Sequence, residues 1–149
     1  MPQDLEQLKH EMSRLAVRIG SEGFGIKLDY SNESIKNVEK ILGKIHDEYK
    51  QTGSEDGLQG IAFEFASYIV KVIEKNVGPA RWQRDHAKLG PDSFPLAVGE
   101  GEIFPVSWCI KRIYDGPGDD VWFKYNFLVL KQDPPSEKKS LFGKLFGNQ

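Results

Sequence analysis

Few residues of the chain have the type and spacing that chemistry needs. Asp85 and His86 are adjacent, but a hydrolytic site needs a nucleophile beside a base that is itself oriented. Adjacent side chains of an extended segment point to opposite sides, so this pair predicts only a weak dyad. His10 and His46 fall on the polar faces of two expected helices, and we expect both imidazoles to be exposed to solvent.

Glu64 lies between Phe63 and Phe65 in the most apolar stretch of the chain. A carboxylate in such a place is costly unless it reaches water or a partner. We therefore expect the Glu64 carboxylate to reach water through a gap or to pair with a Lys or Arg. The alternative is a pocket carboxylate with a raised pKa, as in a small hydrolase or ligand-binding enzyme. Cys109 falls on the apolar stripe of its expected helix, which predicts a small core residue rather than a nucleophile.

Metal and cofactor motifs are missing from the sequence. The chain has no CxxC, no HExxH and no acidic run with the spacing of a calcium loop, so we predict neither a metal ion nor a cofactor. Asp115, Asp119 and Asp120 surround Gly116 and Gly118. Turns favour these residue types, and we therefore expect a turn with capping carboxylates there.

The turn-rich centre of the chain is rich in aromatic and cationic residues, the types most often found at binding hot spots. The group comprises Arg81, Trp82, Arg84, Phe94, Phe104, Trp108, Lys111 and Arg112. We predict a face that binds a protein partner, with Trp82, Arg84, Trp108, Lys111, Arg112 and the separate Glu64 as candidate binding residues. The alternative is that the Trp side chains lie in the core and the Arg side chains at its rim, because aromatic residues dominate cores as well.

The spacing of apolar residues predicts three helices in the first half of the chain. Apolar residues recur every three or four positions from Leu5 to Ile19, and glycines end that helix. A second helix is expected after Ser31, a favourable N-cap. Residues 58–77 are apolar on nearly every side, and such a helix must be covered by other elements, so we place it at the centre of a compact domain.

The second half predicts a small sheet and further helices. Turn residues crowd residues 78–104, which predicts short strands near residues 81–84, 94–98 and 102–104, the last two joined as a hairpin. A helix is expected from Pro105. Residues 121–131 fit both a strand and a helix, and we favour the helix because the segment is apolar all round. The fold class predicted is α+β, with four or five helices and a small antiparallel sheet.

Length and charge limit the classes of protein. A chain of 149 residues suits one domain, which we expect at residues 1–131. A formal net charge of −2 and a pI near 5.9 argue against a nucleic-acid partner. The single cysteine and a start without signal-peptide features predict a cytoplasmic protein. No apolar run approaches the roughly 20 residues of a transmembrane helix.

Residues 132–149 are expected to form a flexible linker and a short amphipathic tail. The tail places Leu141, Phe142, Leu145 and Phe146 on one side of a helical turn, among several lysines. Exposed apolar clusters usually mark a binding site, so we predict a docking peptide for a protein groove or, more weakly, for an anionic membrane surface. The alternative is a terminus that is frayed or folds back on its own body.

Four segments together resemble a bacterial family of small cytoplasmic domains of unknown function. They are LDYSNESI at 28–35, ASYIVKVIEKNVGPARW at 66–82, FPLAVGEGEIFPVSW at 94–108 and KRIYDGPGDDVWFKY at 111–125, and the resemblance covers roughly residues 25–130. Tyr68, Gly78 and Trp82 match the family's pattern, whereas Val70 and Lys71 replace its Gly-Glu pair. The family has no established activity, so the resemblance concerns fold and origin.

The sequence therefore predicts a non-catalytic protein-binding or accessory module. Immunity proteins of bacterial conflict systems share this size and style, and by that analogy an immunity-type role is one form of the prediction. The rival is the small hydrolase or ligand-binding enzyme, using Glu64 or the pair Asp85 and His86. A pocket with a buried carboxylate would favour the rival, and a flat or convex aromatic surface would favour the binding module.

Overall fold

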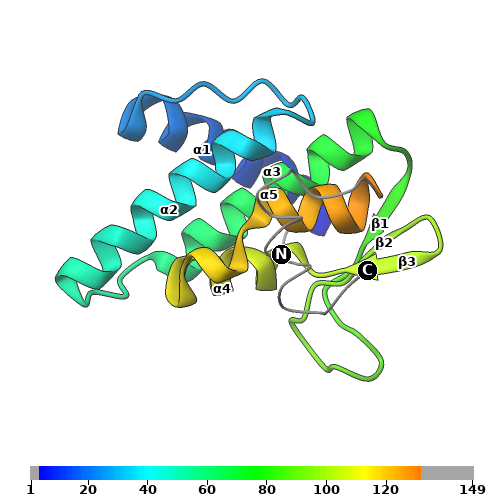
Figure 1. Ribbon diagram of the computed structural model, residues 1–149. Coiled ribbons are helices and arrows are strands. Elements are labelled where there is room, and N and C mark those ends of the chain that lie inside the picture. Colours follow the sequence, from blue (N-terminus) through cyan, green and yellow to red (C-terminus); the bar gives the residue numbers. More distant parts are fainter. Residues whose placement is uncertain (1–3, 132–149) are drawn as a thin grey trace, which may run out of the picture.

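The computed structural model describes residues 4–131, which form an α+β fold. The elements follow in the order α1 (Leu5–Arg18), η1 (Ile19–Gly23), α2 (Ser34–Thr52), α3 (Leu58–Asn76), β1 (Ala80–Trp82), β2 (Leu96–Val98), β3 (Gly101–Ile103), α4 (Pro105–Asp115), η2 (Pro117–Asp119), α5 (Val121–Lys124) and η3 (Tyr125–Val129). Figure 1 shows the helices gathered in one body, with the sheet at the end where α3 finishes.

Helix α3 is the central element, as its all-round apolar sequence predicts. It packs against α1 and α4, and residues 65–70 are buried without interruption. Val72 and Ile73 extend the buried run toward the end of the helix. The helix stops before Gly78, whose φ of 157° is readily adopted only by glycine.

The sheet is antiparallel and has the order β1-β2-β3. Trp82 of β1 pairs with Leu96 of β2, and Val98 of β2 pairs with Gly101 of β3. The last two strands are joined by a two-residue turn that begins at Gly99, with a φ of 57°. The predicted hairpin is thus confirmed, with Gly101 inside the strand rather than in the turn.

Helix α1 is confirmed, but its buried side is not the apolar stripe. The residues that it buries are Lys9, Ser13 and Ala16, whereas Leu15 is 36% exposed. At Gly20, just beyond α1, a Cβ would lie only 2.9 Å from the carbonyl oxygen of Ile26.

The segment after Asp120 is helical, which confirms the helix predicted there in preference to a strand. The Asp120 carboxylate accepts a hydrogen bond from the backbone N–H of Phe123 at 2.8 Å and so caps α5. A wider π-helical turn, η3, continues it and buries Tyr125 and Val129. None of the helices within residues 4–131 is long and apolar enough to cross a bilayer.

Candidate functional site

The six candidate binding residues do not form one exposed face. Trp108 is 6% exposed and Arg112 is 7% exposed, so the expectation that both lie on the surface with Trp82 and Arg84 is wrong. Both belong to the inward side of α4. The structure instead separates the candidates into a buried arginine, a groove beside α4 and an aromatic cluster at the base of a loop.

Arg112 serves the interior of the domain. Its guanidinium contacts Glu39 of α2, with Nε 2.9 Å from both carboxylate oxygens and Nη2 2.8 Å from Oε2. The backbone N–H of Val121 donates to the same carboxylate at 3.0 Å. Burial raises the pKa of Glu39 against the opposing effect of this arginine. The pair therefore joins α2, α4 and the start of α5, which is a structural role.

Trp108 and Lys111 line a groove between α4 and the loop of residues 84–94, which we call the α4 groove. Its volume is about 620 Å³. Its apolar lining consists of Leu89, Phe104, Val106, Trp108, Ile110 and Leu128. Lys111 and Lys124 add positive charge, and Asp92 adds one carboxylate. The groove is thus an apolar surface with a mainly cationic set of charges.

The loop beside the groove is held by His86. The backbone N–H groups of Lys88 and Leu89 both donate to Nδ1 of His86, at 3.0 and 3.1 Å. Since Nδ1 accepts these bonds, the ring carries its proton on Nε2, which donates to Glu102 at 2.8 Å. His86 and Gly90 also exchange two backbone hydrogen bonds. These contacts hold Leu89 in place although its side chain is 62% exposed.

Trp82 and Arg84 lie at the base of this loop. The indole N–H of Trp82 donates to the carbonyl of Phe94 at 3.1 Å, and its ring stacks on Phe63 with centroids 5.5 Å apart. The guanidinium of Arg84 lies over the Phe94 ring, 5.8 Å from its centroid. Both candidates therefore support the loop, while the Arg84 side chain remains 53% exposed.

The histidines do not assemble a catalytic dyad. Asp85 accepts the backbone N–H of Asp92 at 2.9 Å, whereas His86 contacts Glu102, so Asp85 does not orient the imidazole. His10 is about half exposed, as expected. His46 is buried, and the expectation of solvent exposure is wrong for it. Its Nδ1–H donates to the carbonyl of Ile113 at 2.7 Å, a backbone group that no local pattern reveals.

Glu64 and Cys109 are both withdrawn from solvent, Glu64 in part and Cys109 completely. Burial raises the pKa of Glu64, which is half-buried. No hydrogen bond or ion pair forms at its carboxylate within residues 4–131. Cys109 is fully buried in the core as predicted, and burial raises the pKa of its thiol, which suppresses the reactive thiolate. Across the described part of the chain, no group of three or more His, Cys, Asp or Glu residues has the geometry of a metal site.

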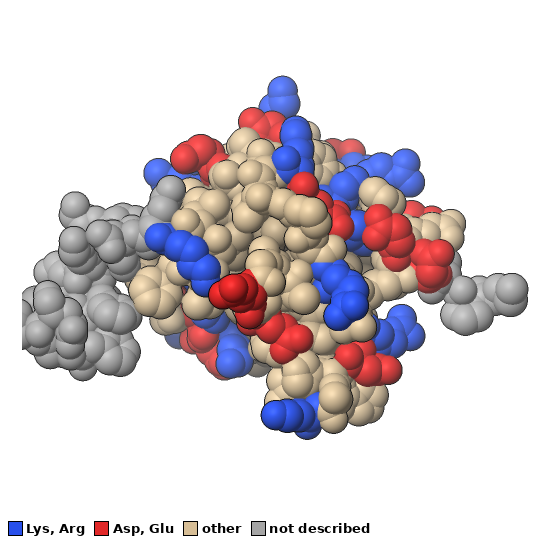
Figure 2. Space-filling view, turned by 90° about the vertical axis from the view of Figure 1, so that its right-hand side faces the viewer, with Lys and Arg blue, Asp and Glu red and all other residues tan. Residues whose placement is uncertain are grey.

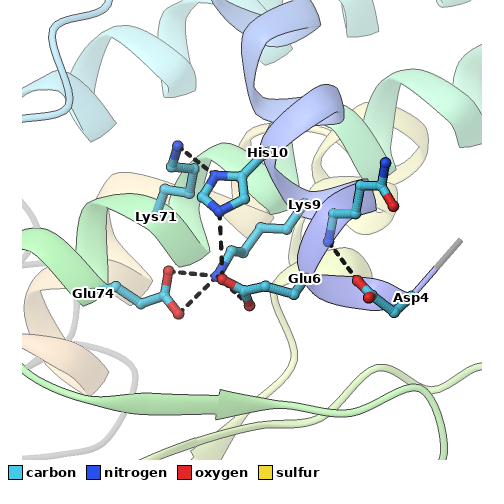
Figure 3. A network of polar contacts seen from close by, with 7 residues as sticks. Asp4, Glu6, Lys9, His10, Lys71 and Glu74 are labelled. Atoms are coloured by element: carbon cyan, nitrogen blue, oxygen red, sulfur yellow. Dashed lines mark hydrogen bonds and ion pairs between the residues drawn. The ribbon is translucent and has the colours of Figure 1, made fainter.

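A buried lysine network joins α1 to α3, and sequence reasoning missed it. The ammonium of Lys9 lies 2.8 Å from both carboxylate oxygens of Glu6 and 2.7 Å from Oε1 of Glu74 (Figure 3). Burial opposes the charge of Lys9, but these hydrogen bonds outweigh it and raise its pKa. At the edge of the network, Lys71 donates to Nδ1 of His10 at 2.9 Å. In the sequence, α1 is recognisable only by its apolar stripe, and that pattern does not indicate that Lys9 is buried.

The LDYSNESI segment and Tyr68 meet in a second polar cluster. The backbone N–H of Tyr30 donates to the fully buried hydroxyl of Tyr68 at 2.8 Å, and Ser34 lies 2.6 Å from that hydroxyl. Tyr30 itself has a φ of 63°, a conformation that non-glycine residues adopt rarely. Its ring stacks on Tyr68 with centroids 4.7 Å apart. Tyr68 thus fixes the turn that leads into α2.

Two further predictions concern the family of the chain and its C-terminal tail. Comparing the chain with protein-family models, curated proteins and solved structures returns no match. The resemblance to a bacterial domain family accordingly stays a prediction. The tail candidates Leu141, Phe142, Leu145 and Phe146 lie outside the described residues.

Proposed function

We propose that this protein is a non-catalytic binding module whose α4 groove holds an apolar segment of a partner protein. The observation that carries the proposal is the exposed Leu89 on a loop whose backbone is held by hydrogen bonds. Exposed apolar side chains are common, but one presented on an ordered loop beside an apolar groove can bind without a large cost of ordering. Leu89 is therefore the expected anchor of the contact.

The charges of the groove favour a partner segment that carries a carboxylate. Lys111 is exposed and has no hydrogen-bond or ion-pair partner within residues 4–131, while Lys124 contacts Asp119 at 3.2 Å. A carboxylate beside Lys111 would add steering and specificity rather than much affinity. A groove of about 620 Å³ admits only a few side chains, so it would form the centre of a larger contact.

A protein partner suits the surface better than nucleic acid does. Figure 2 shows basic and acidic side chains interspersed over the face that it presents, with uncharged areas between them. Nucleic-acid binding usually needs a basic patch, and the net charge of the chain is −2. A cytoplasmic, immunity-type or accessory role remains part of the proposal, as does weak membrane contact through the tail.

The enzyme alternative finds less support in the geometry. A general base should lie within hydrogen-bond reach of a group that orients or uses it. Glu64 does not line the α4 groove, and Asp85 does not contact the His86 ring. A screen of ester, phosphate and peptide substrates should therefore show no turnover. A rate abolished by Glu64→Gln or His86→Ala would favour the enzyme instead.

The binding proposal can be tested by site-specific photo-crosslinking in cells. A photoreactive amino acid at Ser93, which lines the groove, should capture a defined protein, whereas the same group at exposed Lys27 should not. Equal capture at both positions would contradict the proposal.

The captured protein, once purified, allows a quantitative test. Leu89→Asp should weaken its binding at least tenfold, as expected for a hot-spot residue, and Lys111→Glu should weaken it in a salt-dependent way. Leu15→Asp is the matched control, because Leu15 is also an exposed leucine but belongs to α1. Restoration of the Lys111→Glu complex by reversing one acidic residue of the partner would establish the predicted charge contact. Unchanged affinity for Leu89→Asp would overturn the proposal.

A further inference from the structure

A second hollow lies beside the sheet, between the end of α3, the β2–β3 turn and η3. We call it the sheet hollow; its volume is about 760 Å³, and its lining includes Val77, Val98, Glu100, Leu128 and Lys131. We propose that residues 138–147 of the same chain occupy this hollow through their apolar side chains. The hollow shares Leu128 with the α4 groove, but the inference is argued from observations other than those that carry the function proposed for that groove.

The hollow exposes apolar side chains from separate elements. Val77, at the end of α3, is 40% exposed, and Leu128, in η3, is 39% exposed. Val98 of β2, partly buried, is also part of the lining. Neighbouring exposed apolar residues around a concave surface usually mark a contact. Covering them would stabilise the protein in proportion to the apolar area removed from water.

The course of the chain points to its own tail as the occupant. Lys131, the last described residue, is part of the lining, so the described chain ends at the hollow itself. Leu141 follows ten positions later, and an extended chain of that length spans at most about 35 Å. Such a linker is long enough to turn back. Because it is short, the tail is present at an effective concentration on the order of millimolar, which a weak contact can exploit.

Side-chain chemistry favours the sheet hollow over the α4 groove as the place for the tail. Residues 131–149 carry a net charge of +2, and the remainder of the chain carries −4. The sheet hollow offers exposed Glu100 on its rim, where Lys138, Lys139 or Lys144 can pair with it. The α4 groove presents two lysines against one aspartate, whereas Glu100 and Lys131 balance each other in the sheet hollow, so the cationic tail is repelled less there. Leu141, Phe142, Leu145 and Phe146 supply the apolar surface.

The test places a nitroxide spin label on the tail of the full-length protein. Ser140→Cys provides the attachment point, and fully buried Cys109 should not react in the folded state. The label broadens the NMR signals of backbone amides within roughly 20 Å. We expect strong broadening at Val77 and Gly99. Gly53 and Gly57, at the opposite end of α3, should be unaffected.

Two matched variants separate docking from mere proximity. Replacing Leu141, Phe142, Leu145 and Phe146 by Ser should abolish the broadening at Val77 and Gly99 without touching the folded domain. Val77→Asp changes the hollow instead of the tail, at a position already 40% exposed. It should also reduce the broadening at Gly99. Broadening that persists in both variants, or spreads evenly over the surface, would overturn the proposal.

Other occupants appear as distinct outcomes of the same experiment. Mixing spin-labelled chains with isotope-labelled chains that carry no spin label detects contact between two copies, and we expect no broadening in that sample. Broadening there would assign the hollow to the tail of a second copy. If the tail leaves Val77 and Gly99 unaffected and instead binds vesicles of anionic and zwitterionic phospholipid, it attaches to membranes and not to the hollow. Either outcome would contradict the proposal.

Discussion

Lys9 of α1 and Glu74 of α3 form an ion pair across 65 positions of sequence, with Nζ 2.7 Å from Oε1. The lysine side chain is only 2% exposed, and that of Glu74 is 31% exposed. A buried ammonium must keep its partners, because an unpaired charge in the interior is strongly unfavourable. The pair therefore makes the attachment of α1 dependent on one carboxylate of α3.

Removing that carboxylate should destabilise the protein. We expect Glu74→Ala to lower the free energy of unfolding by about 2 kcal/mol, since Lys9 then keeps only the largely exposed Glu6. Chemical denaturation followed by circular dichroism measures the change. Glu22→Ala is the control, because its ion pair with Arg18 is exposed on both sides, and it should cost less than about 0.5 kcal/mol. Equal losses in the two variants would show that Glu74 has no special role.

The same lysine predicts a dependence on alkaline pH. The pKa of Lys9 is raised above 10.5 in the folded state, so its stabilising contribution is complete below pH 10.5 and is lost as the pH rises through the folded pKa. The difference in unfolding free energy between wild type and Lys9→Met should therefore be constant from pH 7 to pH 10 and change above pH 10.5. Comparing the two proteins cancels the titration of groups that they share. A difference that already changes near pH 8 would contradict the raised pKa.

The loop beside the α4 groove should depend on the acceptor at Nδ1 of His86. His86→Leu removes the acceptor of two backbone N–H groups, and trypsin should then cleave after Lys88 at least several times faster. Trypsin should cleave the His86→Asn variant more slowly than the His86→Leu variant, because the Asn side-chain oxygen can accept hydrogen bonds from these N–H groups at a similar place. Cleavage after Lys44 of α2 serves as the reference. Equal rates for the two variants would mean that the imidazole does not hold the loop.

Two helical glycines predict opposite effects of the same substitution. At Gly43 a new Cβ would lie 2.8 Å from Nη2 of Arg112, so Gly43→Ala should strain the Arg112–Glu39 pair and destabilise by about 1–3 kcal/mol. At Gly60 a Cβ would meet nothing within 4 Å, so Gly60→Ala should stabilise α3 by about 0.5–1 kcal/mol. Thermal or chemical denaturation of the two variants measures both effects. A gain in stability at Gly43 would show that the arginine can move aside without loss.

Local patterns predicted much of the fold. Helix α3 and the β2–β3 hairpin follow from apolar periodicity and from turn residues, which act over a few positions. The burial of Arg112 and His46 could not be predicted in this way. Their partners, Glu39 and the carbonyl of Ile113, lie 73 and 67 positions away, and a sequence pattern does not show which distant groups will meet.

Only part of the candidate site could be predicted, again because a sequence pattern does not show which distant groups will meet. Trp108 and Lys111 do line a groove, but the ordered presentation of Leu89 depends on His86 and Glu102, and nothing in the sequence connects these two residues. Leu89 stands between a lysine and a glycine and belongs to no apolar repeat that would indicate a helix or a strand. Exposed apolar residues on loops become recognisable only when the hydrogen bonds of the loop are known.

The contact between Tyr125 and Asn32 has a consequence for synthesis on the ribosome. The Tyr125 hydroxyl donates to the Asn32 side chain from 93 positions further along the chain, and Val121 reaches Glu39 across 82. The turn before α2 therefore cannot complete its contacts until nearly all of residues 4–131 have left the exit tunnel. Contacts so distant in sequence slow folding relative to a bundle of neighbouring helices. We thus expect the nascent chain to acquire its full structure after translation of the domain ends, rather than helix by helix during synthesis.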